Sequence, residues 1–292
     1  MRSALTRTNG ARFMIAGWSL ASEHAEGLEV FRTAVFCALI GTAVLEAEPV
    51  PVRHAEGLIR GFLILRSLDG DAIADGDLIQ NVRGDRVTSR LVFHFKDGSL
   101  HDETVVIRQH GSFRLISDHL VQKGRTFPQP LDMTIDAAAG RVTVRYADKD
   151  GAEKVESKEM EIPADLANGS LPILLKNIRP DAPPKRVSLI AATPSPRLVK
   201  LEITPAGEER FSTAGAAHRA THYVVKVDIG GLVGFFAPLV GKQPPDSHVW
   251  IMEGDAPAFV KSEQPLYLGG PVWRIELVSP VWPRRESTLR SR

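Results

Sequence analysis

The 292-residue sequence contains a single cysteine, Cys37. Disulfide bonds within the chain are therefore excluded, and a chain of this length can be held together by packing alone. Charge of one sign is also lacking, because 36 Lys and Arg residues stand against 35 Asp and Glu residues. Without a positive field, and without a helix-turn-helix, RNA-recognition or zinc-finger motif, we expect no nucleic-acid partner.

Motifs for covalent and phosphate chemistry are missing as well. The sequence has no G-x-S-x-G element for a serine nucleophile. Gly230-Gly231 is not followed by the lysine and hydroxyl spacing of a phosphate-binding loop. These absences favour a non-enzymatic protein without a cofactor.

An apolar run from Thr33 to Leu45 follows Arg32 and is too short to span a bilayer. A basic residue, about a dozen apolar residues and then small residues before Glu48 are typical of a secretory signal. We expect residues 1–47 to be a leader and signal-like segment, with the true start near Val30 and a mature chain that is periplasmic or secreted and has no transmembrane segment. The alternative is a buried N-terminal helix.

The stretch from Arg86 to Val121 shows how the rest of the chain folds. Asp97-Gly98 and His110-Gly111 each separate two runs of alternating polarity, which predicts two-residue turns and a three-stranded meander. That register places His94 opposite His101, Phe95 opposite Leu100, Glu103 opposite Asp118 and Asp102 opposite His119. One face, expected to be the core, then carries Leu91, Phe93, Phe95, Leu100, Val106, Phe113 and Leu115. The other face, expected to be wet or partly covered, carries Arg90, Val92, His94, His101, Glu103, Val105, Asp118 and Leu120.

Strand-like segments continue on both sides of the meander. The charged segment 153–161 is expected to be an exposed edge strand, and Pro163–Ile178 is the best helical candidate, limited to short pieces by Pro172. The expected fold class is mainly β: a strongly curved antiparallel sheet or half-barrel with one short helical insert. We assign residues 48–283 to a single β domain and 284–292 to a polar tail.

From about Gly76 to Pro280 the order of segments resembles a class of periplasmic all-β envelope proteins of unknown function. The resemblance is carried by the meander, the apolar piece 171–178, and the C-terminal segment in which Val249-Trp250 precedes Ala256-Pro257-Ala258. Domain-of-unknown-function family thirty-one-oh-eight is an example of this class, and its curved sheet looks like the half-barrel of lipoprotein carriers. The resemblance implies a fold, a compartment and the handling of a lipid or other hydrophobic ligand. It supplies no catalytic residues.

Two sets of side chains on the meander are candidates for chemistry. The first set consists of His94, His101, Glu103 and Asp118. Imidazole and carboxylate groups are the usual ligands of Zn²⁺, so this set is a candidate metal site. The alternative is an exposed surface of mixed charge. Asp102 facing His119 could orient a general base, or could be a simple ion pair. His218 and His222 lie about 13 Å apart along a strand, too far to share one metal without a bend.

An apolar, glycine-flanked run from Leu232 to Val240 is a candidate flap over a ligand groove or a patch that touches a membrane or partner, with a buried loop as the alternative. The expected ligand-binding residues are Leu232, Phe235, Phe236, Leu239, Trp250, Tyr267 and Trp273. The leading hypothesis is a non-enzymatic periplasmic protein that holds an apolar small molecule, such as a lipid chain, in the concave face of the sheet. The alternatives are an envelope scaffold with a protein partner and no ligand cavity, and a metal-assisted hydrolase that uses the histidines.

Overall fold

The computed structural model describes residues 48–148, 150–213, 216–228 and 244–278. The chain divides into two units, Met1–Ala43 and Val44–Arg292, and every described residue belongs to the second. The leader, the polar tail and the run from Leu232 to Val240 lie outside the described residues. Within the described ranges, no helix has both the length and the apolar character needed to cross a bilayer.

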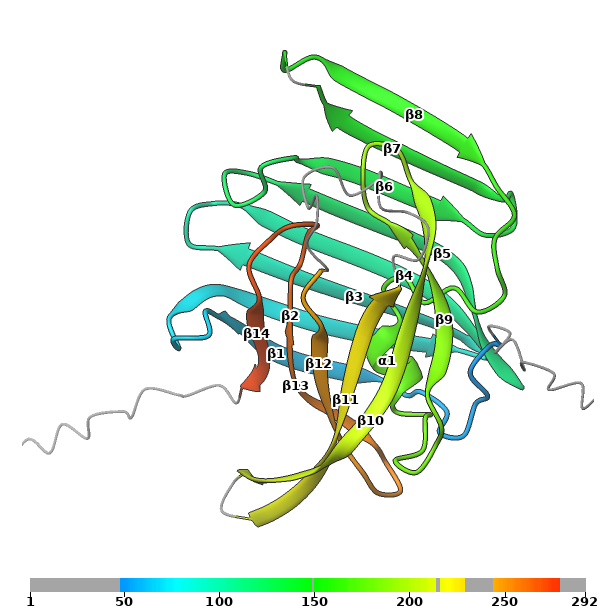
Figure 1. Ribbon diagram of the computed structural model, residues 1–292, viewed down its shortest axis with the longest axis vertical. Helices are drawn as coiled ribbons and strands as arrows, with labels where there is room; N and C mark the ends of the chain where they lie inside the picture. Colours follow the sequence, from blue (N-terminus) through cyan, green and yellow to red (C-terminus); the bar gives the residue numbers. More distant parts are fainter. Residues whose placement is uncertain (1–47, 149, 214–215, 229–243, 279–292) are drawn as a thin grey trace, which may run out of the picture. The chain divides into compact units, whose positions relative to one another are not determined.

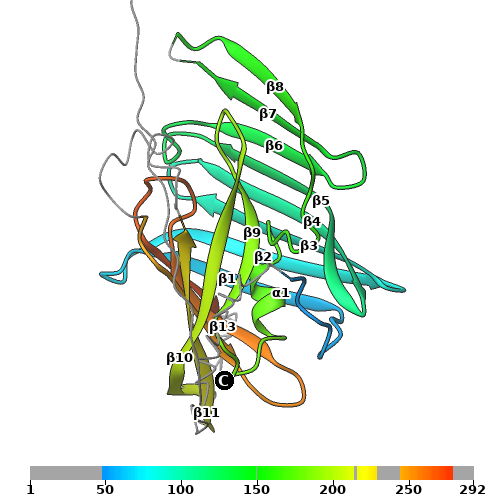
Figure 2. The same ribbon diagram turned by 45° about the vertical axis from the view of Figure 1, so that its right-hand side comes forward.

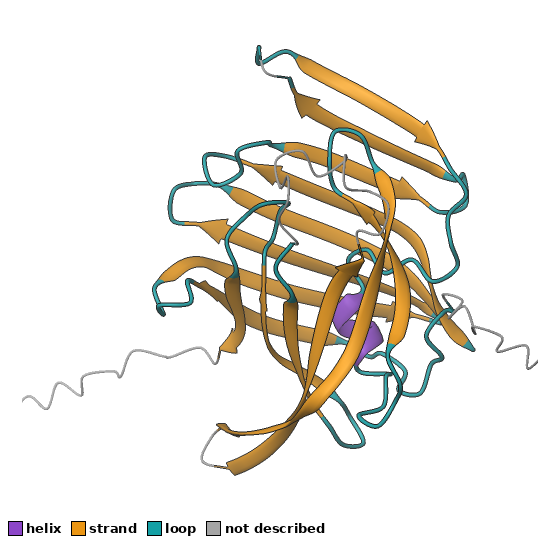
Figure 3. Cartoon of the chain, viewed as in Figure 1, coloured by secondary structure: helices purple, strands orange, loops and turns teal. Residues whose placement is uncertain are grey.

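The described part of the second unit is one antiparallel sheet with a short helix, as the sequence predicted (Figures 1 and 3). Its strand order is β8-β7-β6-β5-β4-β3-β2-β1-β14-β13-β12-β11-β10-β9, so most neighbours in the sheet are also neighbours in the sequence. The elements are β1 (Ile59–Arg66), β2 (Ala72–Arg83), β3 (Arg86–Phe95), β4 (Leu100–His110), β5 (Ser112–Lys123), β6 (Leu131–Asp136), β7 (Arg141–Ala147), β8 (Glu153–Glu159), α1 (Leu171–Leu175), β9 (Lys185–Ala191), β10 (Arg197–Thr213), β11 (Ala216–Asp228), β12 (Ser247–Met252), β13 (Ala258–Gln264) and β14 (Trp273–Val278).

The sheet bends so that its two ends face each other. In both ribbon views β9 to β12 cross in front of the strands from β2 to β7, with α1 between them (Figures 1 and 2). One buried cluster draws side chains from all three parts, including Val105 of β4, Leu175 of α1 and Val249 of β12. Among the described residues β8 and β9 do not pair with each other, so the sheet stays open.

The two edge strands are protected in different ways. β8 has charged residues at most positions and all its side chains are exposed or half-buried, which agrees with the predicted edge and discourages pairing with another chain. The edge of β9 is covered by the chain just before α1. There the Ala167 N–H donates to the Ser188 carbonyl at 2.9 Å, and Asn168 exchanges two side-chain hydrogen bonds with the Ile190 backbone, each at 2.9 Å.

The first turn of the meander is one residue longer than predicted. The Gly98 N–H donates to the Phe95 carbonyl and the Phe95 N–H donates to the Ser99 carbonyl, both at 3.0 Å, so Lys96-Asp97-Gly98 forms a three-residue loop. Gly98 has a φ of 84°, which suits the left-handed position that ends such loops. Consequently Phe93 faces His101 and His94 faces Leu100, and both the predicted His94–His101 pair and the predicted Phe95–Leu100 pair are wrong.

The second turn is also different, and a β-bulge follows it. His110 pairs with Ser112 around Gly111, and Ile116 is the extra residue between the Ile107–Leu115 and Val106–Ser117 pairs. Val105 therefore faces Asp118, Glu103 faces Leu120 and Asp102 faces Val121. The predicted direct pairs of Glu103 with Asp118 and of Asp102 with His119 are wrong, although Glu103 and Asp118 still share a face as diagonal neighbours.

The two shifts also reverse which face of β4 is buried. His101, Val105, Asp118 and Leu120 are buried on the concave side, together with Phe93. Leu100 and Val106, predicted to lie in the core, are only half-buried on the other face. The part of the predicted wet face that β4 and β5 contribute therefore lies inside, because α1 and the strands from β9 to β12 cover it. Arg90 and His94 of β3 are exposed, as predicted.

Gly76 of β2 permits a close contact between neighbouring strands. A Cβ atom there would lie 2.5 Å from two ring carbons of Phe93 and 2.8 Å from the Val92 carbonyl oxygen. We expect Gly76→Ala to lower the free energy of unfolding by about 1–3 kcal/mol, because the Phe93 ring has no room to move within the core. Chemical denaturation checks this. Gly57→Ala is the control, since a Cβ there meets nothing within 4 Å, and equal losses in the two variants would contradict the prediction.

Candidate functional site

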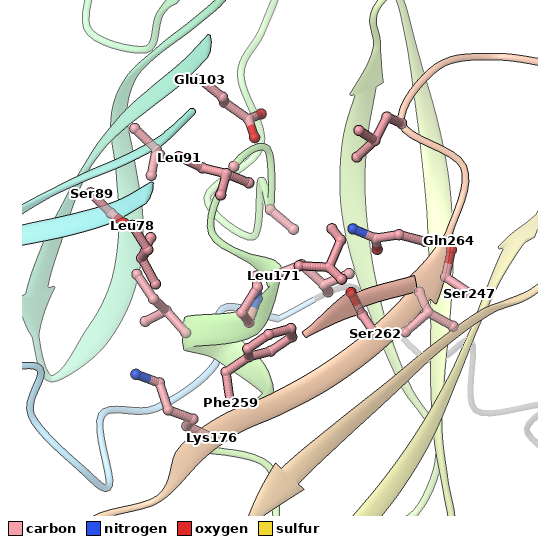
Figure 4. A pocket seen from close by; sticks show the side chains of 18 of the residues that line it. Leu78, Ser89, Leu91, Glu103, Leu171, Lys176, Ser247, Phe259, Ser262 and Gln264 are labelled. Atoms are coloured by element: carbon pink, nitrogen blue, oxygen red, sulfur yellow. The ribbon is translucent and has the colours of Figure 1, made fainter. Parts of the chain in front are cut away.

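A cavity of about 940 Å³ lies on the concave side of the sheet. Leu78 and Leu91 of β2 and β3 line one wall, Phe259 of β13 lines the opposite wall, and Leu171 and Lys176 lie between them (Figure 4). Leu189, Leu201 and Val225 add apolar surface from β9 to β11. The volume falls within the range of pockets that hold small molecules, roughly 300–1,000 Å³.

One polar group of the cavity wall is a buried ion pair whose partners satisfy each other. Lys176 Nζ donates to Glu56 Oε2 at 2.6 Å, and the side chains are only 8% and 4% exposed. Gln80 Nε2 donates to the same oxygen at 2.8 Å and to the Gly57 carbonyl at 2.9 Å. This part of the wall therefore carries two opposite charges that neutralise each other.

His101 is a second polar group on the wall, and its orientation is set by Gln122. Gln122 Nε2 donates to the Leu266 carbonyl at 2.7 Å and lies 3.1 Å from His101 Nδ1. Because the amide nitrogen donates, Nδ1 accepts and the ring hydrogen belongs on Nε2. Burial lowers the pKa of His101 to about 4, so the ring is neutral near pH 7. The buried Nε2 atom has no hydrogen-bond partner among the described residues.

Glu103, which is half-buried, and Asp118, which is fully buried, form a pair of carboxyl groups near His101. Both flank Gly169, since a Cβ atom on that glycine would lie 3.1 Å from Asp118 Oδ1 and 3.3 Å from Glu103 Oε1. Asp118 is fully buried, and neither of its oxygens has a partner at hydrogen-bonding geometry within the described part of the chain. Glu103 lines the cavity and its carboxyl group points into it (Figure 4).

Burial opposes the ionisation of both Glu103 and Asp118 at once. Removal from water raises the pKa of Glu103 to about 7. The pKa of Asp118 is raised well above its ordinary value, first by burial and then by the neighbouring Glu103 charge, against a smaller lowering by the backbone N–H of His119. Two carboxylates in a dry site cannot both ionise easily, so near pH 7 the pair holds at least one proton.

The predicted metal ligands do not come together. His94 is exposed on the convex face, whereas His101, Glu103 and Asp118 lie on the concave face. Among the described residues, no three His, Cys, Asp or Glu side chains are grouped as metal ligands. The hydrolase alternative required the His94 and His101 nitrogens to lie within about 4 Å of each other or of one carboxylate, and the register places the two histidines on opposite faces of the sheet.

The other predicted polar pairs have different partners. Arg90 binds Asp102 through two hydrogen bonds of 2.9 and 2.6 Å, and His119 Nε2 lies 3.0 Å from Asp132 Oδ1. Both contacts are exposed surface pairs. His222 contacts His248 at 2.9 Å, and His218 packs on Phe211 at a ring separation of 5.5 Å.

Of the predicted ligand-binding aromatics, Tyr267 lines the cavity. Trp250 lies on the opposite face of its strand, stacked on His222 at 4.5 Å with Lys261 Nζ 3.9 Å from its ring centre. Trp273 packs on Phe95 in the smaller hydrophobic cluster and is not part of the cavity wall. Leu232, Phe235, Phe236 and Leu239 lie outside the described residues.

Sequence reasoning missed Glu56, Lys176 and Gly169. Lys176 stands in the apolar stretch LPILLKNI, and a lysine in such a context is a usable signal of a buried charge that needs a partner. Its partner is 120 residues away in the sequence. No local pattern identifies that residue.

No protein-family model and no curated protein sequence matches this chain. One solved structure, described as a β-barrel-like protein of domain of unknown function DUF1849 from Brucella abortus, is similar, with a TM-score of 0.43 and 9% sequence identity. The similarity covers 78% of this chain and 98% of that one.

Proposed function

We propose that this protein is a non-enzymatic binding protein that holds an apolar molecule, such as a lipid chain, in the cavity of its curved sheet. The observation that carries the proposal is the cavity itself, about 940 Å³ of space walled mainly by leucine, valine and alanine side chains. Apolar side chains that line an open concavity of this size stay in contact with water unless a ligand covers them, and removing such surface from water is favourable.

The cavity favours a ligand-binding protein over the scaffold alternative. In a scaffold the concave side would be filled by the side chains of the two facing walls. Here Leu78, Leu91 and Leu189 line the cavity and each keeps part of its surface accessible, although the strands around them are otherwise well packed. An apolar ligand would contact this surface, which lies inside the cavity and which no protein side chain covers completely.

The proposal includes a periplasmic or secreted location and kinship with the lipoprotein-carrier-like envelope proteins named above. The location is supported by Arg32 and the apolar run up to Leu45, and the kinship by the segment order and the curved sheet. Mass analysis of the protein extracted from its own host tests the location. We expect a mature chain that begins near Glu48, and a chain that begins at residue 1 would contradict it.

Filling the cavity tests the binding function. We expect the wild type to bind a neutral apolar dye such as Nile red, with a rise in fluorescence, and Leu91→Trp to weaken binding by at least about tenfold because the indole ring occupies the ligand volume. Leu68→Trp is the matched control, since Leu68 is 50% exposed in the β1–β2 loop and does not line the cavity. Absence of saturable dye binding by the wild type, or equal binding by both variants, would contradict the proposed function.

A further inference from the structure

The polar groups of the cavity wall, together with Asp118 beside Gly169 of that wall, fall into two kinds. Glu56, Lys176 and Gln80 are hydrogen-bonded to one another. His101 Nε2 and both oxygens of Asp118 are buried without partners in the described part of the chain, and Glu103, beside Asp118, points into the cavity. Buried polar groups are rarely left unpaired, because each one loses its hydrogen bonds to water. The second kind therefore has unused capacity to bind a ligand.

Among the described residues, the side chains around Glu103 include no counterion for its carboxylate. Its cross-strand neighbours are Leu91 and Leu120, and Gly169 lies against it from the segment before α1. His101, two residues away on the same face, is neutral near pH 7. The facing strands β9, β10 and β11 contribute Leu189, Val199, Leu201 and Val225 to the cavity.

The remaining charged and titratable residues of the cavity wall do not supply that counterion either. Lys176 is paired with Glu56 at 2.6 Å. Arg53 and Asp255 are exposed, and His54 is half-buried, on loops at the margin of the cavity. Within the described residues, the buried end of the cavity thus contains acids and a neutral imidazole but no unpaired base.

From this arrangement we propose that the ligand is an amphiphile with a long apolar chain and an amine at its polar end, bound with its ammonium group against Glu103. This inference rests on the proposed function and names the class of ligand. The ammonium group supplies both the missing positive charge and hydrogen-bond donors for the carboxyl pair. The Nε2–H of His101 then donates to a neutral acceptor on the ligand, such as a hydroxyl oxygen next to the amine.

A fatty acid is the amphiphile that this arrangement disfavours. Its carboxylate would lie beside Glu103 and Asp118 in a poorly solvated site, where like charges repel strongly. An uncharged alcohol lies between the two cases, because it can bind the carboxyl group but does not neutralise it. The site should therefore rank three ligands of equal chain length as amine, alcohol and then acid.

Calorimetric titration with dodecylamine, dodecanol and dodecanoic acid, below their aggregation concentrations, tests this order at about pH 8, where Glu103 is ionised. We expect the wild type to bind the amine about tenfold to a hundredfold more tightly than the acid. Glu103→Gln should remove most of that preference while Nile red binding is retained, which shows that the variant folds. Glu153→Gln, at an exposed position of strand β8, should leave the preference unchanged.

The direction of the pH dependence is a second readout. Protonation of Glu103 removes the negative charge that holds the ammonium group, so amine affinity should fall from about pH 8 to about pH 5, and it should fall much less in Glu103→Gln. If the wild type binds all three compounds equally, or prefers the acid, the inference is wrong while the proposed function stands. If the wild type binds neither Nile red nor any of the three, both are wrong.

Discussion

Lys176→Met is expected to lower the free energy of unfolding by about 3–5 kcal/mol, because removing one member of a buried ion pair leaves the other charge without compensation. Lys176 Nζ and Glu56 Oε2 are 2.6 Å apart and nearly inaccessible to solvent. In the variant, Glu56 Oε2 keeps only the Gln80 amide as a donor. Denaturation with urea, followed by circular dichroism, measures the loss.

Two further variants make this result specific. Arg179→Met breaks an ion pair of the same length, 2.6 Å, whose side chains are 62% and 66% exposed, so it should change the free energy of unfolding far less than Lys176→Met does, because solvent screens an exposed pair. A double variant, Lys176→Met with Glu56→Leu, should recover much of the loss because no unpaired charge remains. If Lys176→Met costs no more than Arg179→Met, the burial of this ion pair is refuted.

The second large effect is a dependence of stability on pH that comes from the carboxyl pair. Glu103 and Asp118 have raised pKa values in the folded protein, so the folded state holds protons that the unfolded state releases. Their contribution to stability is therefore full below their unfolded pKa values of about 4, and is lost as pH rises through the folded values. For Glu103 the loss is expected between about pH 4 and about pH 7, at up to about 1.4 kcal/mol for each pH unit.

His101 acts in the opposite direction, and the experiment has to separate the two effects. Its pKa is lowered to about 4 by burial, so its contribution is present above about pH 6.5 and is lost as pH falls toward about 4. A variant with Glu103→Gln and Asp118→Asn retains His101. Urea denaturation at several pH values measures the free energy of unfolding of the wild type and of this variant. The value for the wild type minus the value for the variant should fall as pH rises. A difference that is flat or rises with pH would mean that the carboxyl pair is not buried as described.

Much of the fold could be predicted from the sequence because strands depend on local chemistry. In β7, Val142 and Val144 alternate with Arg141, Thr143 and Arg145, and the structure buries both valines fully. The charged segment that forms β8 was recognisable as an edge. The segment Pro163–Ile178 was predicted to hold only short helical pieces, and the structure has one, Leu171–Leu175, with Pro172 in its first turn, where proline is tolerated.

The candidate site was only partly predictable, since a difference of one residue in a turn reverses the faces of a strand. His101, Glu103 and Asp118 were identified as residues of interest, but the register that joined them to His94 was wrong at the Asp97-Gly98 turn. A two-residue and a three-residue loop are both compatible with Asp-Gly. The choice between them depends on how β3 and β4 twist within the whole sheet.

The sequence by itself determined that this chain forms an antiparallel sheet with one short helical piece and a charged edge, because alternation, turn residues and charge act over a few neighbouring positions. Only the tertiary structure decided that the face carrying Glu103 and Asp118 is the inner one, and that Lys176 meets Glu56. Both outcomes depend on the bend that brings β9 to β12 and α1 over the strands around β4. Such a bend sums small twists over the whole sheet, so no single segment encodes it.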